Sequence, residues 1–149
     1  MIFRLATSKD IPGIQLVRNA VKENRLSNPA LVPDSDVDLY IHHRGRGWVC
    51  EIENHIVGFS IADLQDDNIW ALFVEPGFEK RGIGSKLQQL MLDWYFEQGK
   101  DSVWLGTAPG TRAESFYRAT GWKEIGTHGK GEIKFQLTKD GWLRKAGTA

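Results

Sequence analysis

Two glycines and two basic residues lie together in the middle of the chain and could bind an anion. Gly82 and Gly84 follow Lys80 and Arg81, between an apolar segment and an amphipathic one. A helix leaves its first N–H groups without intrahelical partners and has a positive dipole end, so an anion placed there is stabilised. Because glycine has no Cβ, the backbone can approach that anion closely. The spacing therefore predicts a phosphate-binding turn.

The segments on either side of the turn have the patterns of a strand and a helix. The apolar run from Ile69 to Val74 shows no alternation and predicts a strand buried on both faces. Pro76 and Gly77 then break the strand. The segment after the turn predicts an amphipathic helix that ends at Gly99. Its apolar stripe consists of Ile83, Leu87, Leu90, Met91, Trp94 and Tyr95.

Two better-known phosphate motifs do not fit this segment. A P-loop would need Lys and then Ser or Thr where this chain has Ile83 and Gly84. A dinucleotide-binding fingerprint would need a third glycine where this chain has Leu87. The turn is therefore of another kind.

The segment resembles motif A of the GCN5-related N-acetyltransferase (GNAT) family, Gln/Arg-x-x-Gly-x-Gly/Ala after a strand that ends in V-x-P. Here Val74-Glu75-Pro76 matches the strand end and Gly82-Ile83-Gly84 matches the glycines. The resemblance implies that main-chain N–H groups hold the pyrophosphate of acetyl-CoA, the co-substrate. The cofactor-binding residues it implies are Leu72, Phe73 and Val74 along the pantetheine arm, and Glu79, Lys80, Arg81, Gly82, Ile83, Gly84 and Ser85 around the pyrophosphate.

A second segment, Ala113 to Trp122, resembles motif B of the same family, A-x-x-F-Y-x-x-x-G-F, with Trp122 in place of Phe. Periodicity predicts a short helix in which Ala113, Phe116 and Tyr117 share a face, ended by Gly121. The two motifs occur in the family's order, and the resemblance spans about residues 2–138.

Two positions depart from the family pattern. Glu79 replaces the usual Gln or Arg of motif A, and Gly110 stands where the family often has Asn before motif B. A carboxylate at position 79 would repel phosphate unless it turned to solvent. If Glu79 points into the phosphate site, we expect weak cofactor binding and favour a non-catalytic role.

Acyl transfer to an amine needs donors aimed at the developing oxyanion, a neutral amine and a proton for the departing thiolate. Tyr117 is the candidate acid, because a phenol with an unperturbed pKa of ~10 keeps its proton at neutral pH. The resemblance also places a tyrosine near the thioester sulfur. An aromatic core residue with a polar tip is the alternative interpretation of Tyr117. By the same resemblance, the Val74 N–H would polarise the thioester carbonyl if its strand bulges.

No residue stands out as the general base. Carboxylates on or beside the strands expected to flank the acceptor are each explained by a solvated strand face. They are Glu51, Glu53, Asp63, Asp66 and Asp67. The histidines lack metal-ligand spacing, so we predict no metal site.

Other residues that could do chemistry are interpreted as structural. Alternation places Cys50 with Trp48 and Ile52, which predicts a buried thiol and not an acyl carrier. The tryptophans with apolar neighbours are interpreted as core residues and not as a cage for a cation. They are Trp70, Trp94 and Trp104.

The remaining pattern predicts one α+β domain, with a mixed, mostly antiparallel sheet of six to seven strands and about four helices. Residues 48–53, 56–64 and 69–74 should form an antiparallel meander, and residues 102–107 should lie parallel to the last of these strands. A loop is expected over residues 24–34 and a short helix over residues 35–43. The core should end near residue 138, with residues 139–149 as a loose tail.

Composition narrows the class of protein. The 149 residues suit one domain, and 41% apolar with 26% charged residues is ordinary for a soluble chain. Nineteen basic residues balance nineteen acidic ones, so the basic excess of a nucleic-acid binder is missing. The single cysteine fits a reducing compartment, and no apolar run approaches the ~20 residues of a membrane span. With no signal peptide evident after Met1, we expect a cytoplasmic protein without membrane or nucleic-acid partners, and a homodimer is one option.

Together, the motifs predict an acetyl-CoA-dependent N-acetyltransferase that acts on a primary amine, most simply of a small molecule, by direct transfer in a ternary complex. Two alternatives stay open. One is a protein N-acetyltransferase with an α-amine or lysine acceptor, for which an open, acidic groove would be expected. The other is a non-catalytic acyl-CoA-binding module.

Overall fold

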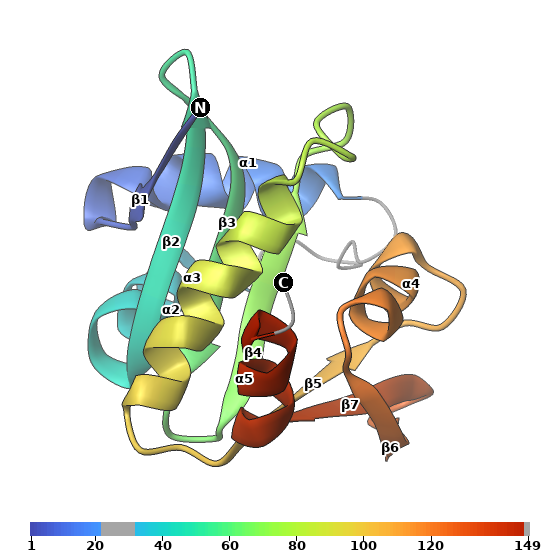
Figure 1. The fold of residues 1–149 in the computed structure, drawn as a ribbon. Helices are drawn as coiled ribbons and strands as arrows, with labels where there is room; N and C mark the ends of the chain where they lie inside the picture. Colours follow the sequence, from blue (N-terminus) through green and yellow to red (C-terminus); the bar gives the residue numbers. More distant parts are fainter. Residues whose placement is uncertain (22–31, 148–149) are drawn as a thin grey trace.

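One seven-stranded sheet organises the chain (Figure 1). The computed structural model describes residues 1–21 and 32–147. The strands are β1 (Ile2–Leu5), β2 (Gly45–Ile52), β3 (His55–Asp63), β4 (Asn68–Val74), β5 (Ser102–Thr107), β6 (Lys123–His128) and β7 (Glu132–Thr138). Their spatial order is β1-β2-β3-β4-β5-β7-β6, and each neighbouring pair is antiparallel except β4 and β5. The predicted meander and the parallel crossover strand are confirmed.

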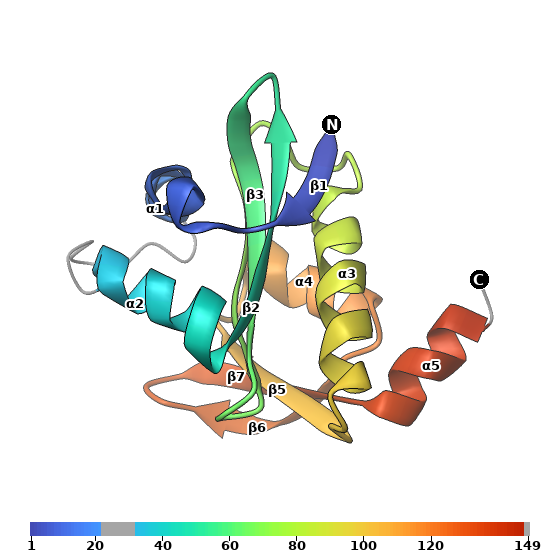
Figure 2. The same ribbon diagram turned by 90° about the vertical axis from the view of Figure 1, so that its left-hand side faces the viewer.

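Helices cover both faces of the sheet. They are α1 (Ile11–Ala20) after a 3-10 turn (Ser8–Asp10), α2 (Asp34–Leu39) continuing into a π-helical turn (Tyr40–Arg44), α3 (Ile83–Glu97), α4 (Arg112–Ala119) and α5 (Lys139–Gly147). Figure 2 shows α1 and α2 on one side of the sheet and α3 and α5 on the other. Each face has its own core: Ile14 of α1 packs with Phe59 of β3 in one, whereas Leu87 and Tyr95 of α3 pack with Phe135 of β7 in the other.

Strand β4 separates from β5 soon after both begin. Their register consists of Asn68 opposite Trp104, and beyond this pair the two strands run apart (Figure 1). Ile69 and Ala71 of β4 are buried, whereas the rest of the strand is half-buried. The prediction of a strand buried on both faces is therefore wrong. The reason is that β5 leaves one edge of β4 uncovered.

A β-bulge in β4 changes which side chains face α1 and α2. Ile61 of β3 lies opposite Ala71 and Ala62 lies opposite Ile69, which leaves Trp70 as the additional residue. Trp70 and Ala71 consequently both pack in the α1/α2 core. Without the bulge, alternation would have sent one of them to the other face.

The C-terminal segment is a helix, so the expectation of a loose tail is wrong. Trp142 of α5 is 8% exposed, and its Nε1–H donates to Asp93 Oδ1 of α3 at 2.8 Å. The Thr138 hydroxyl accepts from Gly141 N at 3.0 Å and satisfies one N–H of the first turn. This helix was not predicted because its segment is short and polar and has no clear apolar periodicity. One buried tryptophan and one capping hydroxyl are too weak a pattern to indicate a helix.

Strand β6 was not predicted. All six of its residues are exposed, so it lacks the alternation that reveals a strand, and its pairing with β7 defines it. The helix expected over residues 35–43 corresponds to α2 and the π-helical turn. The loop expected over residues 24–34 falls largely on 22–31, outside the described residues. Among the described helices, none is long and apolar enough to cross a membrane.

Candidate active site

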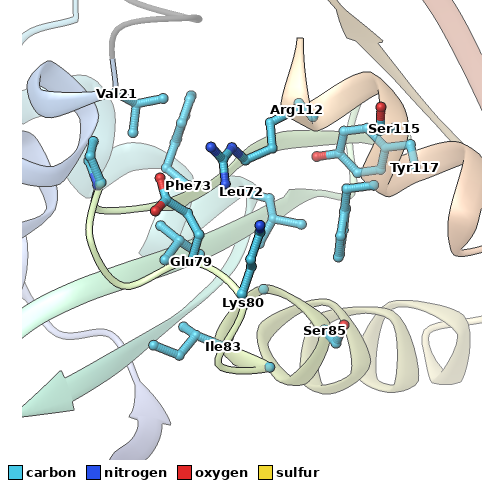
Figure 3. Close-up of a pocket in the computed structure, with 16 residues that line it drawn as sticks. Val21, Leu72, Phe73, Glu79, Lys80, Ile83, Ser85, Arg112, Ser115 and Tyr117 are labelled. Carbon is cyan, nitrogen blue, oxygen red and sulfur yellow. The ribbon is translucent and has the colours of Figure 1, made fainter.

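A cavity of about 670 Å³ lies where β4 diverges from β5 (Figure 3). Its wall comes from β4, the turn after β4, the start of α3 and the start of α4. The lining residues are Val21, Leu72, Phe73, Val74, Pro76, Glu79, Lys80, Gly82, Ile83, Gly84, Ser85, Arg112, Ala113, Ser115, Phe116 and Tyr117. Of the residues predicted for the site, all but Arg81 line this cavity. Arg81 is exposed and lies over the Phe78 ring, 5.2 Å from its centroid.

The start of α3 supplies N–H groups at one end of the cavity. Gly82 is the N-cap with φ of 80°, a left-handed conformation that favours glycine. The Lys86 N–H donates to Gly82 O at 3.0 Å, so the N–H groups of Ile83, Gly84 and Ser85 precede the first intrahelical bond. Together with the helix dipole they form a site that stabilises an anion.

The uncovered edge of β4 supplies further donors. Glu75 N donates to Val57 O at 2.8 Å, and Phe73 lies opposite Phe59 two residues earlier. Because bonded residues alternate along an antiparallel pair, the N–H groups of Leu72 and Val74 point away from β3. They face the side on which β5 has diverged. The bulge that was expected to free Val74 lies at Trp70, four residues earlier in the strand.

Glu79 lies in the cavity wall and does not turn away from it. Its Oε2 accepts a hydrogen bond from Gly77 N–H at 2.9 Å, and Figure 3 shows the carboxylate directed toward the Arg112 guanidinium. The Gly77 hydrogen bond and the charges of Arg112 and Lys80 lower the pKa of Glu79. A negative charge therefore stands at neutral pH beside the predicted pyrophosphate position.

Arg112 is a site residue that the sequence analysis missed. It is the first residue of α4, where Thr111 is the N-cap and its Oγ1 accepts from Glu114 N at 3.2 Å. Its guanidinium enters the cavity across from the start of α3 (Figure 3). A signal was present, because a basic residue directly precedes motif B. Val21 was also missed, and its contribution depends on the position of α1 relative to β4.

Tyr117 closes the cavity on the α4 side. The residue is 6% exposed, and its ring packs against Phe116 and Trp122 at centroid distances of 5.4 and 5.6 Å. Figure 3 shows its phenolic oxygen directed into the cavity, toward Leu72 of β4. Burial raises the pKa of Tyr117, so the hydroxyl keeps its proton at neutral pH. Its surroundings suit a proton donor and not a base.

The carboxylates considered as general bases lie outside the cavity, and most of them form ion pairs with arginine or lysine side chains. Asp63 is 1% exposed and binds Arg44 through two hydrogen bonds of 3.0 and 2.7 Å, so a solvated strand face is the wrong interpretation for it. The other ion pairs are Asp66 with Arg44, Glu51 with Arg4 and Asp67 with Lys100. None of the carboxylates considered as bases lines the cavity.

The buried thiol is confirmed, and so is the core interpretation of Trp70 and Trp94, which pack against the two cores; Trp104 belongs to neither core. Cys50 is fully buried, and burial raises the pKa of its thiol. The tryptophans at positions 70, 94 and 104 are half-buried, and each carries a cation on one face. The pairs are Arg18 over Trp70 at 4.9 Å, Arg46 over Trp94 at 4.9 Å and Lys134 over Trp104 at 4.7 Å.

Solved structures share this fold. A ribosomal-protein-alanine N-acetyltransferase from Brucella melitensis has a TM-score of 0.74 at 20% identity, covering 93% of this chain and 99% of that one. A PaiA N-acetyltransferase from Thermoplasma acidophilum in complex with coenzyme A has a TM-score of 0.79 at 13% identity, covering 93% and 99%. The ribosomal-protein-S18-alanine N-acetyltransferase from Escherichia coli has a TM-score of 0.73 at 15% identity, covering 92% of each chain.

Sequence comparison identifies the family to which the chain belongs. No protein of curated function matches this chain. A sequence model of the acetyltransferase (GNAT) family matches residues 17–122, a range that includes β4, the phosphate turn, α3 and α4. With the cavity at the divergence of β4 and β5, this match identifies the chain as an N-acetyltransferase that belongs to the acetyltransferase (GNAT) family.

Proposed function

We propose that this protein transfers the acetyl group of acetyl-CoA to a primary amine of a small molecule, by direct transfer in a ternary complex. One observation carries the proposal: a single cavity joins the N–H groups at the start of α3 to the Val74 edge of β4 and the Tyr117 hydroxyl. These are the donors that a pyrophosphate, a thioester oxygen and a leaving sulfur each require.

The proposed reaction assigns each bond and proton. The neutral amine nitrogen attacks the thioester carbon and forms the new C–N bond, while the carbonyl oxygen gains negative charge beside the Val74 N–H. The C–S bond then breaks with its electron pair on sulfur. Tyr117 donates its proton to that sulfur, and the phenolate regains a proton from solvent as the new amide nitrogen loses one.

The charges around the cavity favour a small acceptor over a peptide. An acidic groove would attract a basic peptide segment. Among the described residues, the cavity lining contains one carboxylate, Glu79, and two cations, Lys80 and Arg112, so it is not an acidic groove. A protein acceptor remains the second candidate, and the Brucella and Escherichia structures are named for that activity.

Glu79 is the observation that favours a non-catalytic module, because its carboxylate stands beside the expected phosphate. Its effect would fall on cofactor affinity, whereas Val74 and Tyr117, the residues proposed for the acyl transfer, line the same cavity. Family membership also favours an enzyme. We therefore expect catalysis with modest affinity for acetyl-CoA.

Two measurements test the proposal. Acetyl-CoA at ~100 times its dissociation constant should raise the free energy of unfolding by ~2.7 kcal/mol, and no thermal shift at high concentration would reject acyl-CoA binding. A screen of amines for acetyl-CoA-dependent release of free thiol should then find an acceptor. Transfer to peptides but to no small amine would favour the protein acceptor instead.

A further inference from the structure

A buried arginine next to the cavity has an unpaired edge. Arg18, in the last turn of α1, is 8% exposed. Its Nε and Nη2 atoms are closed to solvent and, among the described residues, neither has a hydrogen-bond partner. Burial lowers the pKa of Arg18 to about 10, so the guanidinium still carries its charge at neutral pH. A buried charge of this kind is costly unless it is paired.

Aromatic rings surround the guanidinium and provide no acceptor. The Arg18 Cζ lies 4.9 Å from the ring centroid of Trp70, 5.3 Å from that of Phe73 and 5.7 Å from that of Phe59. Such contacts attract a cation to the ring face. They leave unsatisfied the N–H groups of Nε and Nη2, which require lone pairs in the plane of the guanidinium. The rings therefore hold Arg18 in place without replacing an anion.

The unpaired edge has the geometry that binds a carboxylate. In this same protein, Arg44 uses its Nε and Nη2 to hold the two oxygens of Asp63 at 3.0 and 2.7 Å. Nε and Nη2 form one side of the planar fork and match a carboxylate in a bidentate manner. Those two atoms are the unpaired ones in Arg18.

Three other arginines, including Arg44, have carboxylate partners. Arg4 is bonded to Asp10 and Glu51, and Arg118 is bonded to Glu114 and Glu124. Compared with these, Arg18 is more buried and has no carboxylate partner within the described ranges 1–21 and 32–147. Within these ranges, Arg18 is therefore a buried cation without a counter-charge, which a bound anion could supply.

Arg18 lies behind the wall of the cavity, on the α1/α2 side of the sheet. Phe73, whose ring it covers, lines the cavity, and so does Val21, three residues after Arg18. Phe73 packs in the α1/α2 core, whereas Leu72 and Val74 pack on the α3 side, where the phosphate turn lies. With the cofactor on the α3 side, the acceptor amine is left to enter from the α1/α2 side, next to Arg18.

We infer that Arg18 binds a carboxylate of the acyl acceptor, so that the acceptor is a small amine that carries a carboxylate, as amino acids do. This inference rests on the proposed N-acetyltransferase function and names its substrate class. Because the Arg18 edge is covered in this structure, side chains around it shift when the carboxylate enters. The acceptor is then oriented by its carboxylate while its amine faces the thioester at Val74.

The test compares L-amino acids with the corresponding amino acid amides as acceptors at neutral pH. The wild-type protein should acetylate an acid with a kcat/KM about 10- to 100-fold above that of its amide, as expected for loss of a charge-assisted hydrogen bond. Arg18→Gln should remove this preference while the rate with the amide and the affinity for acetyl-CoA stay within about threefold. Arg18→Lys, which keeps the charge but lacks the fork, should fall between the two.

Arg46→Gln is the matched control. Arg46 also covers a tryptophan, with its Cζ 4.9 Å from the Trp94 ring centroid, but it is exposed and does not line the cavity. This substitution should leave the acid-to-amide preference unchanged. Equal kcat/KM for acids and amides in the wild-type protein would overturn the inference without any variant, even if Arg18→Gln failed to fold.

Direct binding separates this inference from the proposed function. Calorimetric titration of L-amino acids into the coenzyme A complex should give heat with the wild-type protein and about tenfold weaker binding with Arg18→Lys. If no amine of any kind releases thiol, the proposed function fails, and the titration still decides the role of Arg18. Binding of amides as tight as that of acids would overturn the carboxylate assignment.

Discussion

The Glu79 carboxylate accepts a hydrogen bond from the Gly77 N–H at 2.9 Å, within the cavity wall that contains the predicted phosphate turn. A side chain thus neutralises part of the positive potential that the turn would offer to a ligand. Gly77 has φ of 97°, a left-handed conformation that favours glycine. A phosphate placed beside the start of α3 has to share this region with Glu79.

Replacing Glu79 should strengthen cofactor binding. Glu79→Gln removes the negative charge but keeps an amide oxygen for the Gly77 N–H, so acetyl-CoA affinity should rise about three- to tenfold at low salt and less at high salt. Isothermal titration at two ionic strengths measures this. Glu75→Gln is the control, because Glu75 is two residues before Gly77 and does not line the cavity. Unchanged or weaker affinity in Glu79→Gln would show that Glu79 does not oppose the phosphate.

Removing the Tyr117 hydroxyl should slow acetyl transfer without weakening the binding of acetyl-CoA. Tyr117→Phe keeps the ring contacts with Phe116 and Trp122, so acetyl-CoA affinity should stay the same while kcat falls by about 10²-fold. Initial rates of thiol release together with titration of acetyl-CoA separate the two effects. An unaltered kcat would leave Tyr117 as a packing residue only.

The pH profile gives a second view of Tyr117. Since burial raises its pKa above the ordinary value of 10.0, the proton donor remains intact through the range in which an acceptor amine becomes neutral. The value of kcat/KM should therefore rise with pH and show no descending limb below about pH 10. A descending limb near pH 8 that is lost in Tyr117→Phe would contradict the assignment.

The docking of α5 should contribute measurably to stability. Trp142→Ala removes a buried ring and the 2.8 Å bond to Asp93, and should lower the free energy of unfolding by about 3 kcal/mol. Trp142→Phe keeps most of the packing and should cost about 1 kcal/mol. Chemical denaturation measures both. A loss below about 0.5 kcal/mol for the alanine variant would restore the view of this segment as a loose tail.

Asp10 should make the fold sensitive to acid. Arg4 holds it through two hydrogen bonds of 2.8 Å, and these bonds, with that of the Thr7 N–H, lower the pKa of Asp10 below 3.8. A depressed folded-state pKa contributes stability above the unfolded value, and this contribution is lost as pH falls through the folded value. Wild-type stability should thus decline more steeply than that of Asp10→Asn below about pH 3.8. Parallel curves would exclude Asp10 as the cause.

The local parts of the site can be predicted from residues that are neighbours along the chain. The phosphate turn was readable because an apolar strand, two glycines and an amphipathic helix of 15 residues follow one another without interruption. Residues 102–107 were also predicted with their observed boundaries, as the parallel strand that a right-handed crossover after β4 and α3 requires. Tyr117 was found through the family motif around it. In each case, the information lies within one or two neighbouring elements.

The positions of charged groups and exposed strand edges depend on how distant elements pack together. Strand β6 has no buried face, and only its pairing with β7 makes it a strand. The direction of the Glu79 carboxylate and the entry of Arg112 depend on how the start of α4 faces the turn before α3. Arg18 is separated by more than 50 residues from Trp70 and Phe73, the rings that cover it. The periodicity of a sequence indicates which face of a helix or strand is buried. Which residues from distant segments line the cavity depends on the divergence of β4 from β5 and on the bulge at Trp70.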